Sequence, residues 1–314
     1  MIAYAARRVG LSLLVVAVVV VVVFLLIHLI PGDPAVVALG PRATAAGIAD
    51  FHARMGLDRP VPIQIVRFFV ALAQGDLGTD VLTGRSVASI VAAQLPYTLA
   101  LIACSIGWAM LVGVPLGCLA ALRRGGAFDR VSGLLSVSLI AMPSFLVAIY
   151  ALLLLSVTWR LLPAIGSGEG FVDELRHLVL PSLALGAGWV GYLARLVRSG
   201  MLEALGENHI RTARAFGLPH ARIVVGYALR LALPPTITVL GLGVGQMLSA
   251  AVFAEIVFAR PGVGKLAYDS VLARNYPMVA GTVLMTALVY VLVNLGADLV
   301  VASLDPRARR GLVA

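Results

Sequence analysis

The chain has 314 residues, of which 61% are hydrophobic and 12% are charged. Soluble globular proteins carry about 45–50% apolar and about 25% charged residues, so this composition excludes an ordinary water-soluble fold and predicts an integral membrane protein. The formal net charge is +9, and every basic residue except Lys265 is an arginine. Because these arginines are scattered between apolar segments and form no basic face with interleaved aromatic residues, we expect no nucleic-acid partner.

The first apolar run covers residues 9–30, and only Ser12 and His28 in it are polar. A helix of about 20 apolar residues crosses a hydrocarbon core about 30 Å thick. A cleaved signal peptide is the alternative, since Arg7 and Arg8 precede the run, but its apolar region is about 7–15 residues long. The longer run favours an uncleaved transmembrane helix.

Five more segments have the length and hydropathy of membrane spans. They are residues 97–122, 131–159, 178–196, 231–258 and 279–303. With the first run they predict an all-α integral membrane fold with six transmembrane helices. Pro143, Pro181 and the pair Pro234 and Pro235 lie in or beside these spans, where neighbouring helices can satisfy the carbonyl groups that prolines leave free.

Residues 31–96 form a longer connection between the first two spans. Apolar side chains at Ile65, Phe68, Phe69 and Leu72 follow helical spacing, which predicts one or two short helices here. These helices either pack on the membrane part or contact an external partner. We expect residues 1–90 to hold the first span and this helical segment, residues 91–305 a five-helix core, and residues 306–314 a tail.

The arginines predict the orientation in the membrane. With six spans, both termini and the loops near residues 123–130 and 195–230 share one side, which carries 14 of the 24 basic residues. On the other side, residues 31–96 contain five arginines and five aspartates. The basic side is expected to be cytoplasmic, so a bacterial cytoplasmic membrane would hold the chain with both termini inside.

Several motifs that resemble catalytic or metal sites have simpler explanations. The Gly-Val-Gly-Lys sequence ending at Lys265 lacks the spacing and the hydroxyl residue of a phosphate-binding loop. The glycines at 186–191, 113–117 and 241–245 lie in predicted spans, where small residues allow close helix packing. The five histidines are dispersed, and Cys104 and Cys118 share one apolar segment. We therefore expect no catalytic residue, metal site or cofactor in this chain.

Residues 203–223, EALGENHIRTARAFGLPHARI, form a charged island between the fourth and fifth spans. Apolar residues recur at three- and four-residue steps between the charges, which predicts an amphipathic helix ended by Gly217 and Pro219. By spacing alone, this helix could lie on lipid headgroups, cap the helix bundle, or insert its apolar side into a groove of another protein.

The island with the following ALRLALPP resembles the EAA-motif loop of ABC-importer permeases, and specifically of the binding-protein-dependent type I permeases of the peptide/nickel branch. Other landmarks of that family occur in the same order along nearly the whole chain. They include IPGDP at 30–34, MGLDRP at 55–60, GDLGT at 75–79, MPSF at 142–145, HLVLPSLAL at 177–185, AEIVFARPGVGKL at 254–266, RNYPMV at 274–279 and SLDPRAR at 303–309.

The resemblance implies the type I (MetI-like) bundle with a cytoplasmic coupling helix, at about residues 203–219, that docks on an ATPase subunit. Its residues here would be Glu203, Arg211, Thr212, Ala213, Arg214, Phe216, Gly217 and Leu218. The Glu-Ala-Ala of the general motif reads Arg211-Thr212-Ala213, as is usual for this branch. Phe216 stands where the branch often has lysine, which would make the docking surface more apolar.

The resemblance also implies the partners: a second, similar permease forming a heterodimer, two ABC ATPase subunits that hydrolyse ATP, an extracytoplasmic solute-binding protein, and membrane lipid. A di- or oligopeptide is the expected substrate, with nickel, glutathione or another small solute as alternatives. A secondary ion-coupled transporter or a membrane scaffold for a soluble enzyme are further alternatives, although the sequence has no internal repeats or mid-span acids that would favour the former.

Four residues are candidates for lining or gating a pathway: Pro143, Gln246, Glu255 and Asp298. Ionisable groups inside membrane spans are functional candidates by default. Glu255 and Asp298 lie near the ends of their predicted spans, where water or a partner could solvate them. For both acids a structural role is the favoured alternative.

Overall fold

The structure is a computed structural model that describes residues 33–40, 43–55 and 57–304, together with residues 14, 17–22 and 25. Within these residues the fold is helical, and the only pairing of extended chain is an isolated bridge between Thr79 and Ser86. The chain divides into two compact units. Unit 1 is Met1–Thr98 with Pro261–Val291, and unit 2 is Leu99–Arg260 with Leu292–Ala314. The predicted division at residue 90 stays a prediction.

Among the described residues, four helices are long and apolar enough to cross a membrane, or five if one bent pair counts as a span. The four lie at Val87–Leu122, Phe171–Gly206, His220–Gly241 and Tyr276–Asn294. The all-α membrane fold is thus confirmed. The predicted first span, residues 9–30, falls mostly outside the described residues, so the count of six stays a prediction.

The predicted span at residues 131–159 is not one straight helix. It consists of α6 (Ala127–Ala141) followed by α7 (Ser144–Ala151) and the π-helix η2 (Leu152–Thr158), with a bend of 101° between them. Met142 has φ −83° and ψ 120°, because the ring of Pro143 disfavours a helical residue before it. The predicted segment is therefore broken at this proline, and its role as one span stays a prediction.

Two other spans are longer than their hydropathy suggests. The helix α5 (Val87–Leu122) starts ten residues before the predicted 97, with Pro96 inside it. Its first turns bury Val87 and Val91, and this packing stabilises helix that the apolar run alone does not indicate. Likewise α8 (Phe171–Gly206) extends past both ends of the predicted 178–196.

Unit 1 contains the short helices α2 (Pro34–Leu39), α3 (Ala45–Met55) and α4 (Val61–Ala73), the start of α5, α12 (Val263–Leu272) and most of α13 (Tyr276–Leu304). Its core holds Val87, Val91, Val263, Met278 and Leu284. Phe68, Phe69 and Leu72 of α4 pack against that core. The structure therefore supports the packing interpretation of the 31–96 segment, with three helices in place of one or two.

Asp80 fixes the loop between α4 and α5 to the start of α13. It is 5% exposed and accepts hydrogen bonds from the Thr83 hydroxyl, the Asn275 amide and the backbone N–H groups of Leu82 and Thr83. Burial by itself raises the pKa of Asp80, but these hydrogen bonds outweigh it and hold the pKa below its ordinary value. The loop therefore carries a stable carboxylate at neutral pH.

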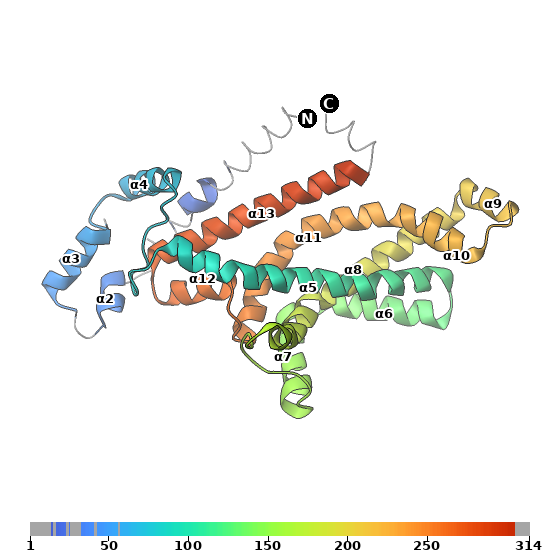
Figure 1. Cartoon of the computed structure of the whole chain (residues 1–314), viewed down its shortest axis with the longest axis horizontal. Helices are drawn as coiled ribbons and strands as arrows, with labels where there is room; N and C mark the ends of the chain where they lie inside the picture. Colours follow the sequence, from blue (N-terminus) through green and yellow to red (C-terminus); the bar gives the residue numbers. More distant parts are fainter. Residues whose placement is uncertain are drawn as a thin grey trace. The chain divides into compact units, whose positions relative to one another are not determined.

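In unit 2, α8 packs against α6, α7 and α11 (Arg230–Val257) (Figure 1). Small residues allow the close approach of α8 to α5 and to α6. A Cβ on Gly117 of α5 would lie 2.4 Å from the Ala194 carbonyl oxygen, and one on Gly191 would lie 2.5 Å from that of Ser136. The predicted close packing of these glycines is confirmed.

The outer faces of α5 and α6 are apolar and exposed. Leu111 is 75% exposed and Leu134 is 71% exposed. A soluble monomer rarely exposes continuous apolar surface, whereas lipid or another membrane subunit covers such a surface without cost. These faces agree with a membrane-embedded unit 2.

Candidate functional site

The charged island folds as two helices. The long helix α8 ends at Gly206, and α9 (Asn208–Ala215) begins after Glu207, whose backbone is extended at φ −68° and ψ 149°. Glu203 therefore belongs to α8, and the prediction of one helix over residues 203–219 was wrong. The Glu207 carbonyl accepts hydrogen bonds from the N–H groups of Ile210 and Arg211, so this residue starts a new helix that turns away from α8.

The apolar side of α9 is already covered by this chain. Ile210 is 0% exposed and Ala213 is 6% exposed, and both pack on Ile223, with Leu205 and Leu218 beside them. This side is therefore not free to enter a groove of another protein. Of the three interpretations of this helix, the one in which its apolar side enters a groove of another protein is therefore wrong.

The carboxyl end of α9 has the hydrogen bonds of a Schellman motif. The Gly217 N–H donates to the Arg214 carbonyl at 3.0 Å, and the Leu218 N–H donates to the Ala213 carbonyl at 3.2 Å. Gly217 has φ +73°, the left-handed conformation that glycine adopts without a Cβ penalty. The helix therefore ends at a defined place, and the direction of Phe216 and Leu218 is set by backbone geometry.

The outward side of α9 is basic and carries one aromatic residue. His209, Arg211, Thr212 and Arg214 are exposed. Phe216 is 82% exposed, the largest exposure of a large apolar side chain among those described. We call residues 207–218 with this outward side the α9 surface. It offers positive charge around a single aromatic ring.

The α9 surface has a firm base. Behind it, Met201 and Ala204 of α8 pack with Val224 and Ala228 of the π-helix η3 (Ile223–Leu229) and with Ala121 of α5. In Figure 1, α9 and the one-turn helix α10 (His220–Arg222) lie together beyond the end of α8. Leu205 of α8 packs against both this cluster and the cluster of Ile210 and Ala213 of α9, so α9 and α8 are joined by apolar contacts.

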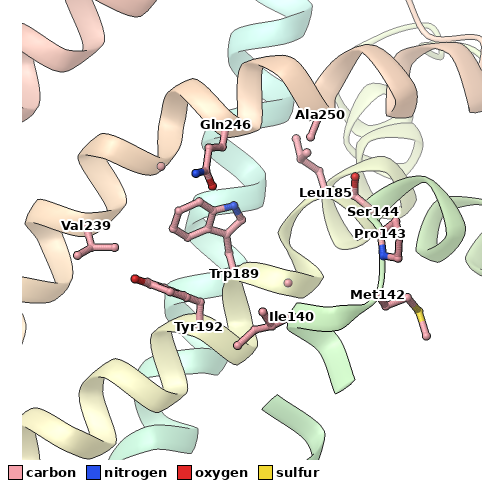
Figure 2. A pocket seen from close by; sticks show the side chains of 12 residues that line it. Ile140, Met142, Pro143, Ser144, Leu185, Trp189, Tyr192, Val239, Gln246 and Ala250 are labelled. Carbon is pink, nitrogen blue, oxygen red and sulfur yellow. The ribbon is translucent and has the colours of Figure 1, made fainter. Parts of the chain in front are cut away.

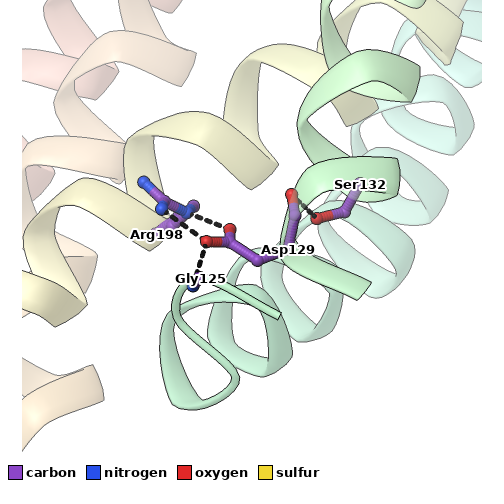
Figure 3. A network of polar contacts seen from close by, with 4 residues as sticks. All are labelled: Gly125, Asp129, Ser132 and Arg198. Atoms are coloured by element: carbon purple, nitrogen blue, oxygen red, sulfur yellow. Dashed lines mark hydrogen bonds and ion pairs between the residues drawn. The ribbon is translucent and has the colours of Figure 1, made fainter. Parts of the chain in front are cut away.

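An ion pair fixes the turn between α5 and α6 to α8 (Figure 3). Arg198 donates from Nε to Oδ1 of Asp129 at 2.5 Å and from Nη2 to Oδ2 at 2.8 Å, and the Gly125 N–H donates to Oδ2 at 2.9 Å. Asp129 is 8% exposed, and the Arg198 side chain is 32% exposed. Sequence reasoning missed this pair, because 69 residues separate its members and no local pattern links them.

Arg198→Ala is expected to lower the thermal unfolding temperature of the purified chain by several degrees, and by more than Asp129→Asn does. Removing Arg198 leaves a nearly buried carboxylate without its counter-charge, which is the costly way to break such a pair. Removing the charge of Asp129 leaves an arginine that water still reaches. Arg195→Ala, an exposed arginine on the same helix, is the control and should change the temperature little. Equal shifts for Arg198→Ala and Arg195→Ala would contradict the role of the pair.

Two of the four pathway candidates meet at one cavity of 540 Å³ in unit 2 (Figure 2). Pro143, at the bend between α6 and α7, and Gln246 of α11 both line it. Sequence reasoning missed Trp189 and Tyr192 of α8, which line it too. The available signal was an aromatic pair three residues apart within a glycine-rich span.

The two acidic candidates lie elsewhere. Glu255 is 0% exposed within α11, so the chain itself and not water surrounds it, and its pathway or structural role stays a prediction. It lies two residues before the end of that helix, and the backbone N–H of the buried Arg260 donates to its carbonyl at 2.9 Å. Asp298 is in α13, and its side chain is outside the part of the chain that the structure describes.

The residues that resemble ligand sites in the sequence have local structural partners. Lys265 forms an ion pair with Asp269 at 2.6 Å, and the N–H of Val263 donates to the Thr98 hydroxyl at 2.9 Å. Among the described residues, no three His, Cys, Asp or Glu side chains lie close enough to hold a metal ion.

The chain matches the family of binding-protein-dependent transport system inner membrane components over residues 113–310, and the amino-terminal region of the same kind of component over residues 1–102. It belongs to this family, as the sequence landmarks predicted. Its members are the membrane permease components of importers and not enzymes.

The relatives include permeases of three transport systems. The chain is 40% identical over 322 residues to the probable D,D-dipeptide transport system permease of Escherichia coli K12, covering 95% of each chain. It is 38% identical over 308 residues to the glutathione transport system permease of Pectobacterium atrosepticum, covering 98% of each. It is 34% identical over 336 residues to the dipeptide transport system permease of Escherichia coli K12, covering 98% of this chain and 99% of that one.

A solved structure of the MetNI methionine ABC transporter in an inward-facing conformation has the same fold. The TM-score is 0.56 at 19% identity, covering 69% of this chain and 97% of the matched one. This likeness confirms the type I permease architecture of the helical core.

Proposed function

We propose that this chain is a permease subunit of an ATP-driven importer of di- and oligopeptides and forms half of the translocation pathway. A second, similar permease, two ATPase subunits and an extracytoplasmic binding protein complete the complex. The names of the dipeptide permeases to which it is similar support the substrate class. The distribution of arginines supports an orientation with both termini in the cytoplasm.

The α9 surface is the site where we propose that the ATPase docks. The single observation that carries this is a short helix, seated on α8 and capped at Gly217, whose exposed side presents Arg211, Arg214 and the ring of Phe216. Aromatic residues and arginines dominate the energetics of protein interfaces. Closure of the ATPase pair would move α9, and the apolar base beneath it would pass that movement to α8 as a rigid-body rotation.

Glutathione is the second candidate substrate. The permease from Pectobacterium atrosepticum that is 38% identical to this chain is named for its transport. Glutathione is itself a small peptide with free carboxylates, so both candidates share their chemistry. Uptake of a labelled dipeptide by the complete importer in the presence of unlabelled glutathione separates the two candidates. Glutathione should reduce the uptake of the dipeptide only if the importer also accepts glutathione.

Charge reversal at the α9 surface tests the docking proposal. Arg211→Glu with Arg214→Glu should lower the amount of ATPase that co-purifies with the chain, and should reduce substrate-stimulated ATP hydrolysis about tenfold or more, because charge complementarity at an interface is replaced by repulsion. Arg176→Glu reverses an exposed arginine at the opposite end of α8 and is the matched control.

Membrane insertion and thermal unfolding of the double variant should match those of the unaltered chain, since both arginines are exposed. Unchanged uptake by the double variant would refute docking at α9. Transport by the chain alone in liposomes, without ATPase, would refute the proposed function itself.

A further inference from the structure

The cavity at the bend of α6 and α7 has the size of a small-molecule site. It lies within unit 2 between α6, α8 and α11, and its 540 Å³ is within the range of about 300–1,000 Å³ that small-molecule sites occupy. Figure 2 shows the indole of Trp189 reaching from α8 into the centre, with the amide of Gln246 directed toward it from α11. Ile140, Pro143 and Val239 contribute apolar walls.

Trp189 is held in place before any ligand arrives. A Cβ on Gly243 would lie 1.8 Å from Cη2 of the indole, so α11 approaches the ring as closely as a glycine allows. Tyr192 meets the ring in an edge-on contact with centroids 5.7 Å apart. Trp189 also packs against the core cluster of Ala109, Val190, Leu193 and Leu240. A ring fixed in this way loses little conformational entropy when it stacks on a ligand.

The chemistry of the lining selects an uncharged group. None of the twelve residues that line this cavity carries a formal charge. The polar groups among them are the Gln246 amide, the Ser144 and Tyr192 hydroxyls and the Trp189 N–H. Moving a charged side chain from water into such a lining is costly without a counter-charge. An apolar or aromatic group gains contact area without this cost.

We propose that this cavity is a transient subsite for the uncharged side chain of a peptide during translocation, with Trp189 as its stacking surface and Gln246 as its polar contact. This proposal rests on the proposed function, and the feature of the substrate that it concerns is an uncharged side chain. The charged termini and charged side chains of the peptide remain outside this subsite. Binding is weak because the lining provides no ion pair, so the peptide is released as the helices move.

Uptake of a dipeptide series by the complete importer in proteoliposomes tests this subsite. Trp189→Ala should raise the KM for dipeptides with leucine or phenylalanine side chains about three- to tenfold, the size expected for the loss of an aromatic contact. The KM for diglycine, and for dipeptides of lysine or glutamate, should stay unchanged. Trp189→Phe should keep most of the preference for apolar dipeptides. Gly243→Ala should raise the KM for these dipeptides as Trp189→Ala does, because its Cβ displaces the indole.

Trp159→Ala, which removes a 60% exposed tryptophan outside the cavity, is the matched control and should alter no KM. If Trp189→Ala raises the KM equally for every peptide, or leaves the KM of the apolar dipeptides unchanged, the subsite is overturned while the proposed function stands. If the unaltered importer takes up none of these dipeptides, the proposed function fails and the subsite with it. If Trp189→Ala lowers the yield of folded chain, Trp189→Phe and Gly243→Ala test the subsite without it. The measured quantity is then the ratio of the KM for apolar dipeptides to the KM for diglycine in each of these two variants.

Discussion

Gly117→Leu is expected to prevent the stable packing of α5 on α8, and even Gly117→Ala is expected to cost about 1–3 kcal/mol of folding free energy. A Cβ at this position would lie 2.4 Å from the Ala194 carbonyl oxygen and 3.0 Å from Cβ of Val197. Neither neighbour is the flexible end of a side chain, so the two helices would have to separate. Purified Gly117→Ala should therefore unfold at a lower temperature, and Gly117→Leu should be recovered in low yield.

Gly107→Ala on the same helix provides the control. A Cβ there meets nothing within 4 Å, and replacing an unstrained helical glycine by alanine stabilises a protein by about 0.4–1 kcal/mol. The same substitution ten residues apart should thus have opposite effects on the unfolding temperature. Equal effects at both glycines would show that helix propensity, and not the α5–α8 approach, governs stability here.

Hydropathy and the length of the apolar runs predicted most of the helical fold. The spans at 231–258 and 279–303 agree with α11 and α13 within three residues, because a long apolar run has few other stable forms in a membrane. The glycines at 113, 117 and 191 were predicted as packing residues, and each lies against the backbone of a neighbouring helix. Small residues that recur at helical spacing in a membrane span are typical of close helix packing.

The remaining features depend on tertiary structure that periodicity does not report. Pro181 lies within α8 without ending it, whereas Pro143 coincides with a bend of 101°. Both prolines lie within predicted spans, so the apolar run alone does not distinguish a tolerated proline from a broken span. Similarly, Ile210 and Ala213 have the spacing of a face that contacts a partner, but their contact is with Ile223 of the same chain.

The structure shows which side of the predicted docking helix faces out. The residues around Arg211–Leu218 came from a motif resemblance, and that resemblance does not state which side chains the chain itself covers. The apolar positions Ile210 and Ala213 pack within the chain, whereas the basic positions and Phe216 are exposed. The docking role itself stays a prediction.

Gly217→Val is expected to abolish most of the substrate-stimulated ATP hydrolysis of the complete importer. Gly217 has φ +73°, and an L-residue in the left-handed conformation costs about 1–2 kcal/mol, with a β-branched residue at the high end. Since a Cβ at this position meets nothing within 4 Å, the whole cost is conformational. The valine variant should relax to a negative φ, which breaks the bonds from the N–H groups of Gly217 and Leu218 and redirects Phe216.

Gly217→Asn is the matched variant, because asparagine tolerates the left-handed conformation at the end of a helix. It should retain most of the ATPase stimulation. Gly206→Ala serves as a second control before the start of α9, since this glycine has open space around it and no positive φ. Loss of stimulation in all three variants, or in none, would contradict the requirement for the left-handed turn.

Thermal unfolding separates a local from a global effect in this series. The packing of α8 with η3 and α5 does not include Gly217, so Gly217→Val should unfold within a few degrees of the unaltered chain. Loss of ATPase stimulation at an unchanged unfolding temperature would then arise from the geometry of residues 214–218 and not from a weakened bundle. Because Gly217→Asn keeps that geometry and Gly217→Val does not, the difference between them measures how strongly the transmission of ATPase motion depends on the end of α9.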